Sequence, residues 1–264
     1  MFTDSHCHLS FPELITQLPE IRESMKAANV GRALCICTSL EEFSTVHGLA
    51  LRGSEFWATV GVHPDNENAS EPGIDRLLQL GNLPRVIGIG ETGLDYYRLG
   101  ERSVADMAWQ RDRFRTHIRA ARELGLPLVV HTRSAADDTL SILREEGEDG
   151  GAGSVGGVFH CFTETPAVAR AALDMGFYIS FSGILTFKNA HELRSVAGFV
   201  PLDRMLIETD SPYLAPAPYR GKVNNPSYVP LVAACLADLR HCRAEQIGEL
   251  TSSNFDTLFR RVLS

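Results

Sequence analysis

The sequence predicts an α/β protein that folds as a single-domain TIM-type (β/α)8 barrel over residues 1–264. Short β-rich runs alternate with helical patterns, and eight such runs can be counted. They end roughly 20 to 40 residues apart, which is the length of one strand, one helix and two loops and favours parallel strands joined by crossover helices. The length of 264 residues is within the range of one barrel, and eight units favour closure over an open sheet.

The expected strands share β-branched or aromatic residues and end near polar side chains; they are Phe2–Asp4, Arg32–Thr38, Phe56–Val60, Val86–Gly90, Leu128–His131, Gly157–His160, Phe177–Phe181 and Met205–Glu208. The helix before the fifth run has clear boundaries. Ser103 and Asp106 form a capping pair at its start, and Gly125 followed by Pro127 ends it. We see no repeat, linker or domain boundary.

Composition limits the classes of partner. A net charge of −8 gives no broad basic face for binding along nucleic acid, although bound cations could still attract a phosphate substrate. No apolar run approaches the roughly 18 residues of a membrane span, and the six cysteines lack the paired spacing of a secreted scaffold. We therefore expect a cytoplasmic monomer with reduced thiols and no membrane contact.

Histidines and carboxylates gather at the predicted strand ends, where the active sites of such barrels lie. Five of the nine histidines fall there, which is more than chance readily gives. His6 and His8 are two residues apart, so both face one side of an extended segment. The candidate metal ligands are His6, His8, Glu91, His131, His160 and Asp210.

This ligand set predicts two divalent cations. Imidazole with carboxylate suits zinc, manganese, iron or cobalt better than an all-oxygen magnesium cage, although Mg²⁺, Zn²⁺ and Mn²⁺ all stay open. One hydrolytic zinc takes about three protein ligands, and six candidates converge here. Glu91 could bridge the two cations with its two oxygens.

Other histidines carry weaker signals. A single strand-end histidine is more often a hydrogen-bonded polar residue than a ligand, so only the ensemble supports the metal site. His63 could be a partner that orients substrate or hydroxide. We expect His47, His117, His191 and His241 on helices, as surface or packing residues.

Residues 88–93 (GIGETG) match the dinucleotide-binding pattern G-x-G-x-x-G after a strand. We reject that interpretation because residues 94–100 are expected to form a loop, so no helix N-terminus follows to receive a pyrophosphate. The glycines more plausibly allow close backbone approach at the barrel mouth.

Substrate contacts are expected on mouth-side loops, including the Pro-rich segment 211–230. The candidates are Arg98, Arg133, Arg220 and Lys222, with Tyr97, Tyr213 and Tyr219 available to stack on bases. A solvated surface charge is an equally good explanation of each cation. Arg133, two residues past His131, is the strongest candidate.

Six strings resemble the signatures of the TatD family of metal-dependent hydrolases, in the right order from residue 3 to about residue 228: TDSHCHL (3–9), VGVHP (60–64), IGETGLDY (89–96), VHTR (130–133), FHCF (159–162) and IETDSPYL (207–214). Residues 157–164 and 180–189 are similar to the YcfH-like branch. The resemblance implies that His6, His8, Glu91 and Asp210 bind one cation and that Glu91, His131 and His160 bind the other.

The resemblance also implies an activity, since family members are described as magnesium-dependent DNases with 3′–5′ exonuclease action. Our hypothesis is a nuclease that hydrolyses phosphodiester bonds at DNA ends with a metal-activated hydroxide, with Asp210 and Glu91 as catalytic groups. An ester or amide hydrolase is the alternative, because the same hydroxide can attack a carbonyl and some relatives remove D-amino acids from tRNA. A non-catalytic metal- or nucleic-acid-binding protein is disfavoured, because binding alone would not need an open two-metal site.

Overall fold

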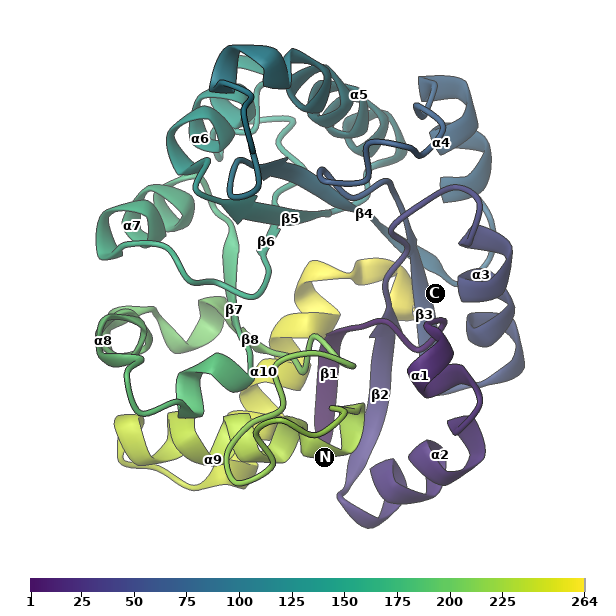
Figure 1. The fold of residues 1–264 in the computed structure, drawn as a ribbon. Coiled ribbons are helices and arrows are strands. Elements are labelled where there is room, and N and C mark those ends of the chain that lie inside the picture. Colours follow the sequence, from purple (N-terminus) through teal and green to yellow (C-terminus); the bar gives the residue numbers. More distant parts are fainter. Residues whose placement is uncertain (264) are drawn as a thin grey trace.

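A computed structural model describes residues 1–263 and shows one parallel eight-stranded sheet, in the order β1 to β8, that curls into a barrel with helices outside it (Figure 1). This confirms the predicted (β/α)8 fold. The strands are β1 Phe2–Cys7, β2 Val30–Cys35, β3 Phe56–Val60, β4 Val86–Asp95, β5 Leu128–Arg133, β6 Gly157–Phe159, β7 Tyr178–Phe181 and β8 Met205–Ile207.

The α-helices are α1 Pro12–Ile15, α2 Leu18–Ala27, α3 Phe43–Arg52, α4 Ile74–Gly81, α5 Ala108–Leu124, α6 Ala136–Glu145, α7 Pro166–Asp174, α8 His191–Phe199, α9 Val229–Arg240 and α10 Ala244–Leu258. Short 3-10 helices are η1 Val104–Met107, η2 Gly183–Thr186, η3 Leu202–Arg204, η4 Pro226–Tyr228 and η5 Arg260–Leu263. Within residues 1–263 none of the helices is long and apolar enough to cross a membrane.

The helix predicted from Ser103 begins with the 3-10 turn η1 and continues as α5. The Asp106 carboxylate accepts hydrogen bonds from the backbone N–H and the hydroxyl of Ser103, both at 2.8 Å. At the other end Gly125 adopts a left-handed conformation with φ of 63°. Both predicted boundaries are confirmed, and the long helix places its buried side against β4.

Only β3 has the predicted bounds; the other strands begin or end one to five residues away from the prediction, and two of these differences bear on the site. β2 ends at Cys35 rather than Thr38, because the N–H of Cys37 donates to the Thr59 hydroxyl instead of continuing the strand ladder. β4 continues to Asp95, so Leu94 and Asp95 are strand and not the expected loop. No helix begins between the end of β4 at Asp95 and Val104, which agrees with rejecting the dinucleotide site.

The extension of β4 depends on glycine. Gly93 pairs with His131 of β5 and has φ of 132°, where L side chains are strained. A Cβ atom at this position would lie 1.9 Å from the carbonyl oxygen of His131. The two backbones can therefore approach only because residue 93 has no side chain, and this approach brings the ends of β4 and β5 together.

The seam between β1 and β8 is closed mainly by loop and side-chain contacts. An isolated parallel bridge joins Cys7 to Ser211, just beyond β8. The Asp4 carboxylate accepts hydrogen bonds from the backbone N–H groups of Thr209 and His6, at 2.9 and 3.2 Å, and from the Thr209 hydroxyl at 2.6 Å. Beyond it the N–H of Asp210 donates to the carbonyl of His6 at 2.9 Å.

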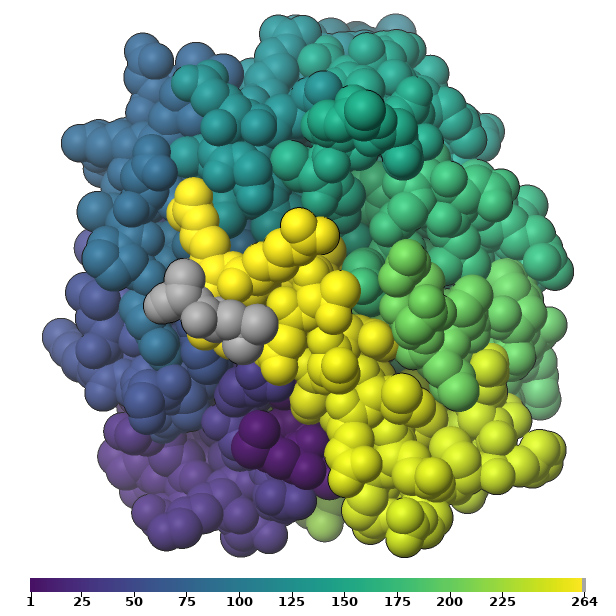
Figure 2. Space-filling view, turned by 180° about the vertical axis from the view of Figure 1, so that it is seen from behind, coloured from purple at the N-terminus to yellow at the C-terminus, as the bar shows by residue number. Residues whose placement is uncertain are grey.

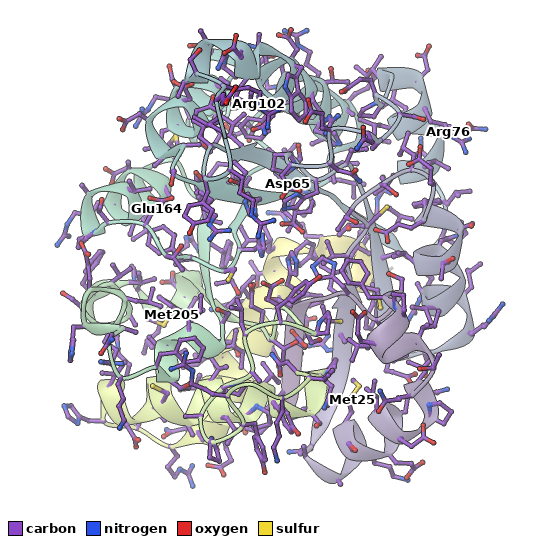
Figure 3. The ribbon with its side chains drawn as sticks, viewed as in Figure 1. Met25, Asp65, Arg76, Arg102, Glu164 and Met205 are labelled. Carbon is purple, nitrogen blue, oxygen red and sulfur yellow. The ribbon has the colours of Figure 1, made fainter. Side chains whose placement is uncertain are left out.

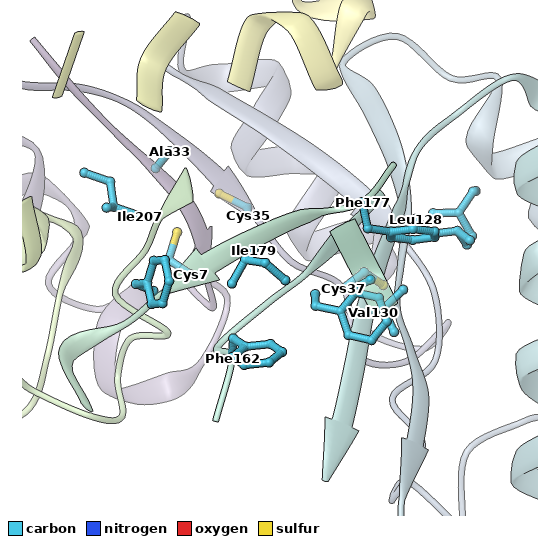
Figure 4. Close-up of a cluster of buried hydrophobic side chains, with 14 of the residues drawn as sticks. Cys7, Ala33, Cys35, Cys37, Leu128, Val130, Phe162, Phe177, Ile179 and Ile207 are labelled. Atoms are coloured by element: carbon cyan, nitrogen blue, oxygen red, sulfur yellow. The ribbon is translucent and has the colours of Figure 1, made fainter. Parts of the chain in front are cut away.

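The hydrophobic core has two parts. One lies between the strands and the helices outside them and includes Cys7, Cys35 and Phe177 (Figure 4). The other lies inside the barrel, where inward-facing strand residues meet Phe255 of α10 and Phe259. The C-terminal segment crosses this end of the molecule (Figure 2), so the opposite end, where the strands terminate, is left for a site.

Gly93→Ala should destabilise the protein by roughly 2 kcal/mol or more, because the new Cβ would collide with the His131 carbonyl at an unfavourable φ. Urea unfolding measures the change. Gly48→Ala is the matched control: Gly48 lies in α3 with open space around it, and alanine there should add roughly 0.5–1 kcal/mol. Equal stability of the two variants would show that β4 does not need this close approach.

Candidate metal centre

The six predicted ligands converge at the C-terminal ends of the strands, although they come from segments far apart in the sequence. His6 belongs to β1, Glu91 to β4 and His131 to β5. His8 and His160 immediately follow β1 and β6, and Asp210 lies three residues beyond the end of β8. Figure 3 views the barrel from this end, with Asp65 and Glu164 on the loops around the opening.

One oxygen of Glu91 faces the histidines of β1. Glu91 Oε2 lies 3.4 Å from His6 Nε2 and 3.8 Å from His8 Nε2. The two Nε2 atoms are 3.3 Å apart, and Asp210 Oδ1 lies 3.6 and 3.4 Å from them. These four side chains therefore enclose one small space with nitrogen and oxygen atoms on all sides.

The other oxygen of Glu91 faces three more imidazoles. Glu91 Oε1 lies 2.7 Å from His160 Nε2, 3.1 Å from His131 Nδ1 and 3.3 Å from His63 Nε2. His63, expected as a substrate contact, is thus nearly as close to Glu91 as His131 is. His63, Glu91 and His131 form a group that could hold a metal ion, as do His6, His8 and Glu91.

The distances between these atoms fit metal binding. Ligand atoms about 2.1 Å from a tetrahedral ion lie about 3.4 Å from one another, which matches the spacing around Glu91 Oε2. Two of these atoms, Glu91 Oε2 and His160 Nε2, are buried without a hydrogen-bond partner. His160 Nε2 is close to Glu91 Oε1, but the contact is not directed as a hydrogen bond. Buried polar atoms are rarely left so, and cations would satisfy them.

The carboxylates of the site carry the negative charge that would attract a cation. Burial would raise the pKa of Glu91, but His160 and His63 lower it well below its usual value. Burial would lower the pKa of His63, but Glu91 and Asp65 raise it to about 10. The carboxylates therefore stay ionised and create a field that favours positive charge, whether carried by protons on the imidazoles or by metal ions.

Two further carboxylates contact the imidazoles from behind, and no sequence pattern singled them out as site residues. Asp95 Oδ2 lies 3.0 Å from His131 Nε2, and Glu208 Oε1 lies 3.3 Å from His160 Nδ1. Each of these two carboxylates contacts the ring nitrogen that faces away from Glu91. Both residues stand within strings already singled out, IGETGLDY and IETDSPYL, but only the fold shows which histidine each one meets.

His117, expected on a helix as a surface or packing residue, is a packing residue that also makes two directed hydrogen bonds. It is fully buried on α5, its Nε2 accepts a hydrogen bond from the backbone N–H of Val62 at 3.0 Å, and its Nδ1 donates to the carbonyl of Arg113 at 2.8 Å. Because Val62 precedes His63, this imidazole fixes the backbone of the loop that carries a site residue. His47 and His191 do lie on helices, whereas His241 ends α9 in a left-handed conformation.

The predicted substrate contacts differ in their placement: Arg98, Arg220 and Lys222 lie exposed on loops, Arg133 is the exposed last residue of β5, and His63 is half-buried. The Arg133 guanidinium stacks 3.6 Å from the centroid of Tyr97, Arg220 lies 4.0 Å from that of Phe187, and Lys222 Nζ lies 5.5 Å from that of Tyr219. Arg98 is exposed and lies near enough to Asp65 to lower the pKa of that carboxyl, after the hydrogen bond from His63. Cations and aromatic rings are thus paired around the opening.

Known proteins are similar to this chain in sequence and in fold. The profile of the family described as TatD related DNase matches residues 3–260. The chain belongs to the TatD family. It is 44% identical over 259 residues to YcfH of Escherichia coli K12, named an uncharacterised metal-dependent hydrolase, and the match covers 97% of this chain and 94% of YcfH.

More distant TatD-family members extend the comparison. The chain is 31% identical over 246 residues to the 3′-5′ ssDNA/RNA exonuclease TatD of Klebsiella pneumoniae, covering 91% of this chain and 90% of that protein. The crystal structure of the TatD homologue YjjV from Escherichia coli superposes with a TM-score of 0.89 at 27% identity and covers 98% of both chains. This protein is therefore a TatD-family metal-dependent hydrolase with clusters of histidine and glutamate at its barrel mouth.

The buried imidazole of His117 predicts a pH-dependent contribution to stability. Burial lowers its pKa from 6.5 to about 4, so the unfolded chain binds this proton more readily than the folded one. The contribution is complete above pH 6.5 and is lost as the pH falls toward 4, by about 2–3 kcal/mol. In urea titrations across this range, the stability advantage of the wild type over His117→Gln should shrink by that amount on acidification; a constant difference would contradict the assignment.

Proposed function

We propose that this TatD-family protein is a two-metal phosphodiesterase that removes nucleotides from the ends of DNA or RNA strands. The observation that carries the proposal is the position of Glu91, whose two oxygens face two separate groups of imidazoles. A bridging carboxylate between two open cation positions is the arrangement used to hydrolyse phosphate esters. The name of the Klebsiella relative, an ssDNA/RNA exonuclease, supports a nucleic-acid substrate.

The residues divide into two ligand sets in this proposal. His6, His8 and Asp210 join Glu91 in holding one cation, and His131 and His160 join Glu91 in holding the other. His63 is close enough to Glu91 to act as a ligand or to contact substrate. Bound Mg²⁺, Zn²⁺ or Mn²⁺ would polarise the phosphoryl oxygens and acidify water.

Asp210 is the proposed proton acceptor. Its side chain is 15% exposed against 3% for Glu91, so it is the carboxylate more open to the mouth. Burial would raise its pKa, but the hydrogen bond from His8 and the neighbouring His6 lower it, so the group is ionised at neutral pH and can accept the proton of an attacking water.

The residues around the opening of the barrel, here called the rim, are suited to binding a few terminal nucleotides. Phe11 stacks on His8 with ring centroids 4.7 Å apart, and Tyr213, which is 55% exposed, packs edge-on against Phe11. This row of rings leads from the metal centre to the surface and would stack on exposed bases, while Arg133 beside Tyr97 would contact phosphate. The net charge of −8 does not favour binding along internal duplex.

The Asp210→Asn variant should lose roughly 100-fold or more in turnover while keeping its fold, because the amide cannot accept the proton. The assay measures release of nucleotides from end-labelled single-stranded DNA by the protein loaded with Mg²⁺, Mn²⁺ or Zn²⁺, and a chelator should abolish it. The control is His191→Ala, which changes an exposed histidine on α8 and should have wild-type activity.

Two results would contradict this part of the proposal. Unchanged turnover of Asp210→Asn would remove Asp210 from the reaction as proton acceptor. Faster metal-dependent hydrolysis of D-aminoacyl-tRNA than of DNA or RNA ends by the wild type would instead favour the ester-hydrolase alternative, since the same centre can attack a carbonyl.

Linear DNA should be degraded at least roughly tenfold faster than a circle of the same sequence, because the rim offers contacts for an end but no long basic track. Affinity for the linear strand should fall only shallowly with salt, with a slope of roughly 2 to 3 on logarithmic axes, as expected for a few phosphate contacts. Side-by-side assays over a salt series measure both. Equal cleavage of the circle, or a steep salt dependence, would show that ends are not what the protein recognises.

A further inference from the structure

A buried carboxylate behind the metal centre has an unusual set of neighbours. Glu208 directly follows β8 and is fully buried. Its Oε1 accepts a hydrogen bond from the backbone N–H of Cys161 at 2.8 Å and lies 3.3 Å from His160 Nδ1. Its Oε2 is buried without a partner. A buried carboxylate oxygen without a donor is costly, so a donor must be sought nearby.

The imidazole of His6 has a ring nitrogen that lacks a hydrogen-bond acceptor. Its Nε2 faces Glu91, His8 and Asp210, and its Nδ1 is buried without a partner. The rings of His6 and His160 stack with centroids 3.8 Å apart and an angle of 9° between their planes. Both rings turn Nε2 toward Glu91, so both Nδ1 atoms lie on the other side.

Glu208 lies on that side. A ring nitrogen of His6, a ring nitrogen of His160 and a carboxylate oxygen of Glu208 all lie within 4.8 Å of one another. His160 Nδ1 lies 3.3 Å from Glu208 Oε1, and one water between His6 Nδ1 and Glu208 Oε2 would give both of these unpartnered atoms a hydrogen bond. A histidine that binds metal through one nitrogen keeps its proton on the other, and an acceptor for that proton fixes the ring.

We infer that Glu208 is a positioning residue that holds His6 and His160 together, with Nδ1 protonated and Nε2 directed at the metal centre. Because His6 lies on the Oε2 side of Glu91 and His160 on the Oε1 side, one carboxylate would align one ligand of each cation. The inference rests on the proposed two-cation centre. Beyond that proposal, Glu208 is assigned the positioning of one ligand in each half of the site and does not itself bind a cation.

The substitution Glu208→Gln tests this at constant shape. The amide oxygen can still accept from Cys161 and His160, which leaves the NH2 group facing His6 Nδ1. His6 would then have to accept at Nδ1 and carry its proton on Nε2, where it points at Glu91 and Asp210 and competes with a cation. We expect the affinity for one of two Zn²⁺ ions to fall roughly 10- to 100-fold, measured by calorimetric titration.

Glu148→Gln is the matched control. Glu148 is also fully buried and accepts hydrogen bonds from the backbone N–H groups of Val155 and Gly156, but its side-chain partner is Arg122 and no histidine. This variant should lose stability and keep wild-type Zn²⁺ affinity at both sites. A purely structural role for Glu208 would make the two variants alike in metal affinity and would overturn the inference.

Nitrogen-15 NMR of the imidazoles provides a second measurement that needs no variant and no metal. In the wild type, His6 and His160 should both carry a proton on Nδ1, with and without Zn²⁺. An unprotonated Nδ1 on either residue would overturn the inference, as would loss of one whole Zn²⁺ equivalent in Glu208→Gln, which would make Glu208 a direct ligand. If the wild type binds no Zn²⁺, Mg²⁺ or Mn²⁺, the proposed function fails, and the protonation of Nδ1 still decides the role of Glu208.

Discussion

Closure of the barrel between β1 and β8 is the constraint on which the rest of the site depends. β8 is short and ends at Ile207, so the seam is held by Asp4, which accepts hydrogen bonds from His6 and Thr209, and by the bond from Asp210 N–H to the His6 carbonyl. Burial raises the pKa of Asp4 to about 8, and the hydrogen bonds from Thr209 and His6 counteract part of that rise. The same bonds that close the barrel set Asp210 opposite His6.

The mouth gathers more negative charge than a protein can bury without compensation. Glu91, Asp95, Glu208 and Asp210 all lie among the imidazoles, and each contacts at least one of them. Protons on the histidines or divalent cations between them can balance this charge. In the proposed function, bound cations and not the acidic surface would attract the phosphate of the substrate.

Residues outside the mouth decide the position of those inside it. Gly93 lets β4 approach β5 closely enough to pair with His131, and His117 on α5 holds the backbone next to His63. Asp95 then orients His131 from behind. Each contact crosses between different segments of the chain, so the geometry around Glu91 is a property of the packed barrel and not of any single motif.

The sequence by itself determined the repeating α/β pattern, the parallel barrel and the set of strand-end residues that meet, because strand period, turn residues and loop position are local properties. It also pointed to Glu91 as the residue between two groups of histidines. Only the tertiary structure decided which ring nitrogen faces Glu91, that His63 lies nearly as close to it as His131, and that Glu208 and Asp95 lie behind the imidazoles. These are contacts between side chains 28 to 85 residues apart, and no local pattern encodes them, since they depend on register and on the way strands close around a common centre.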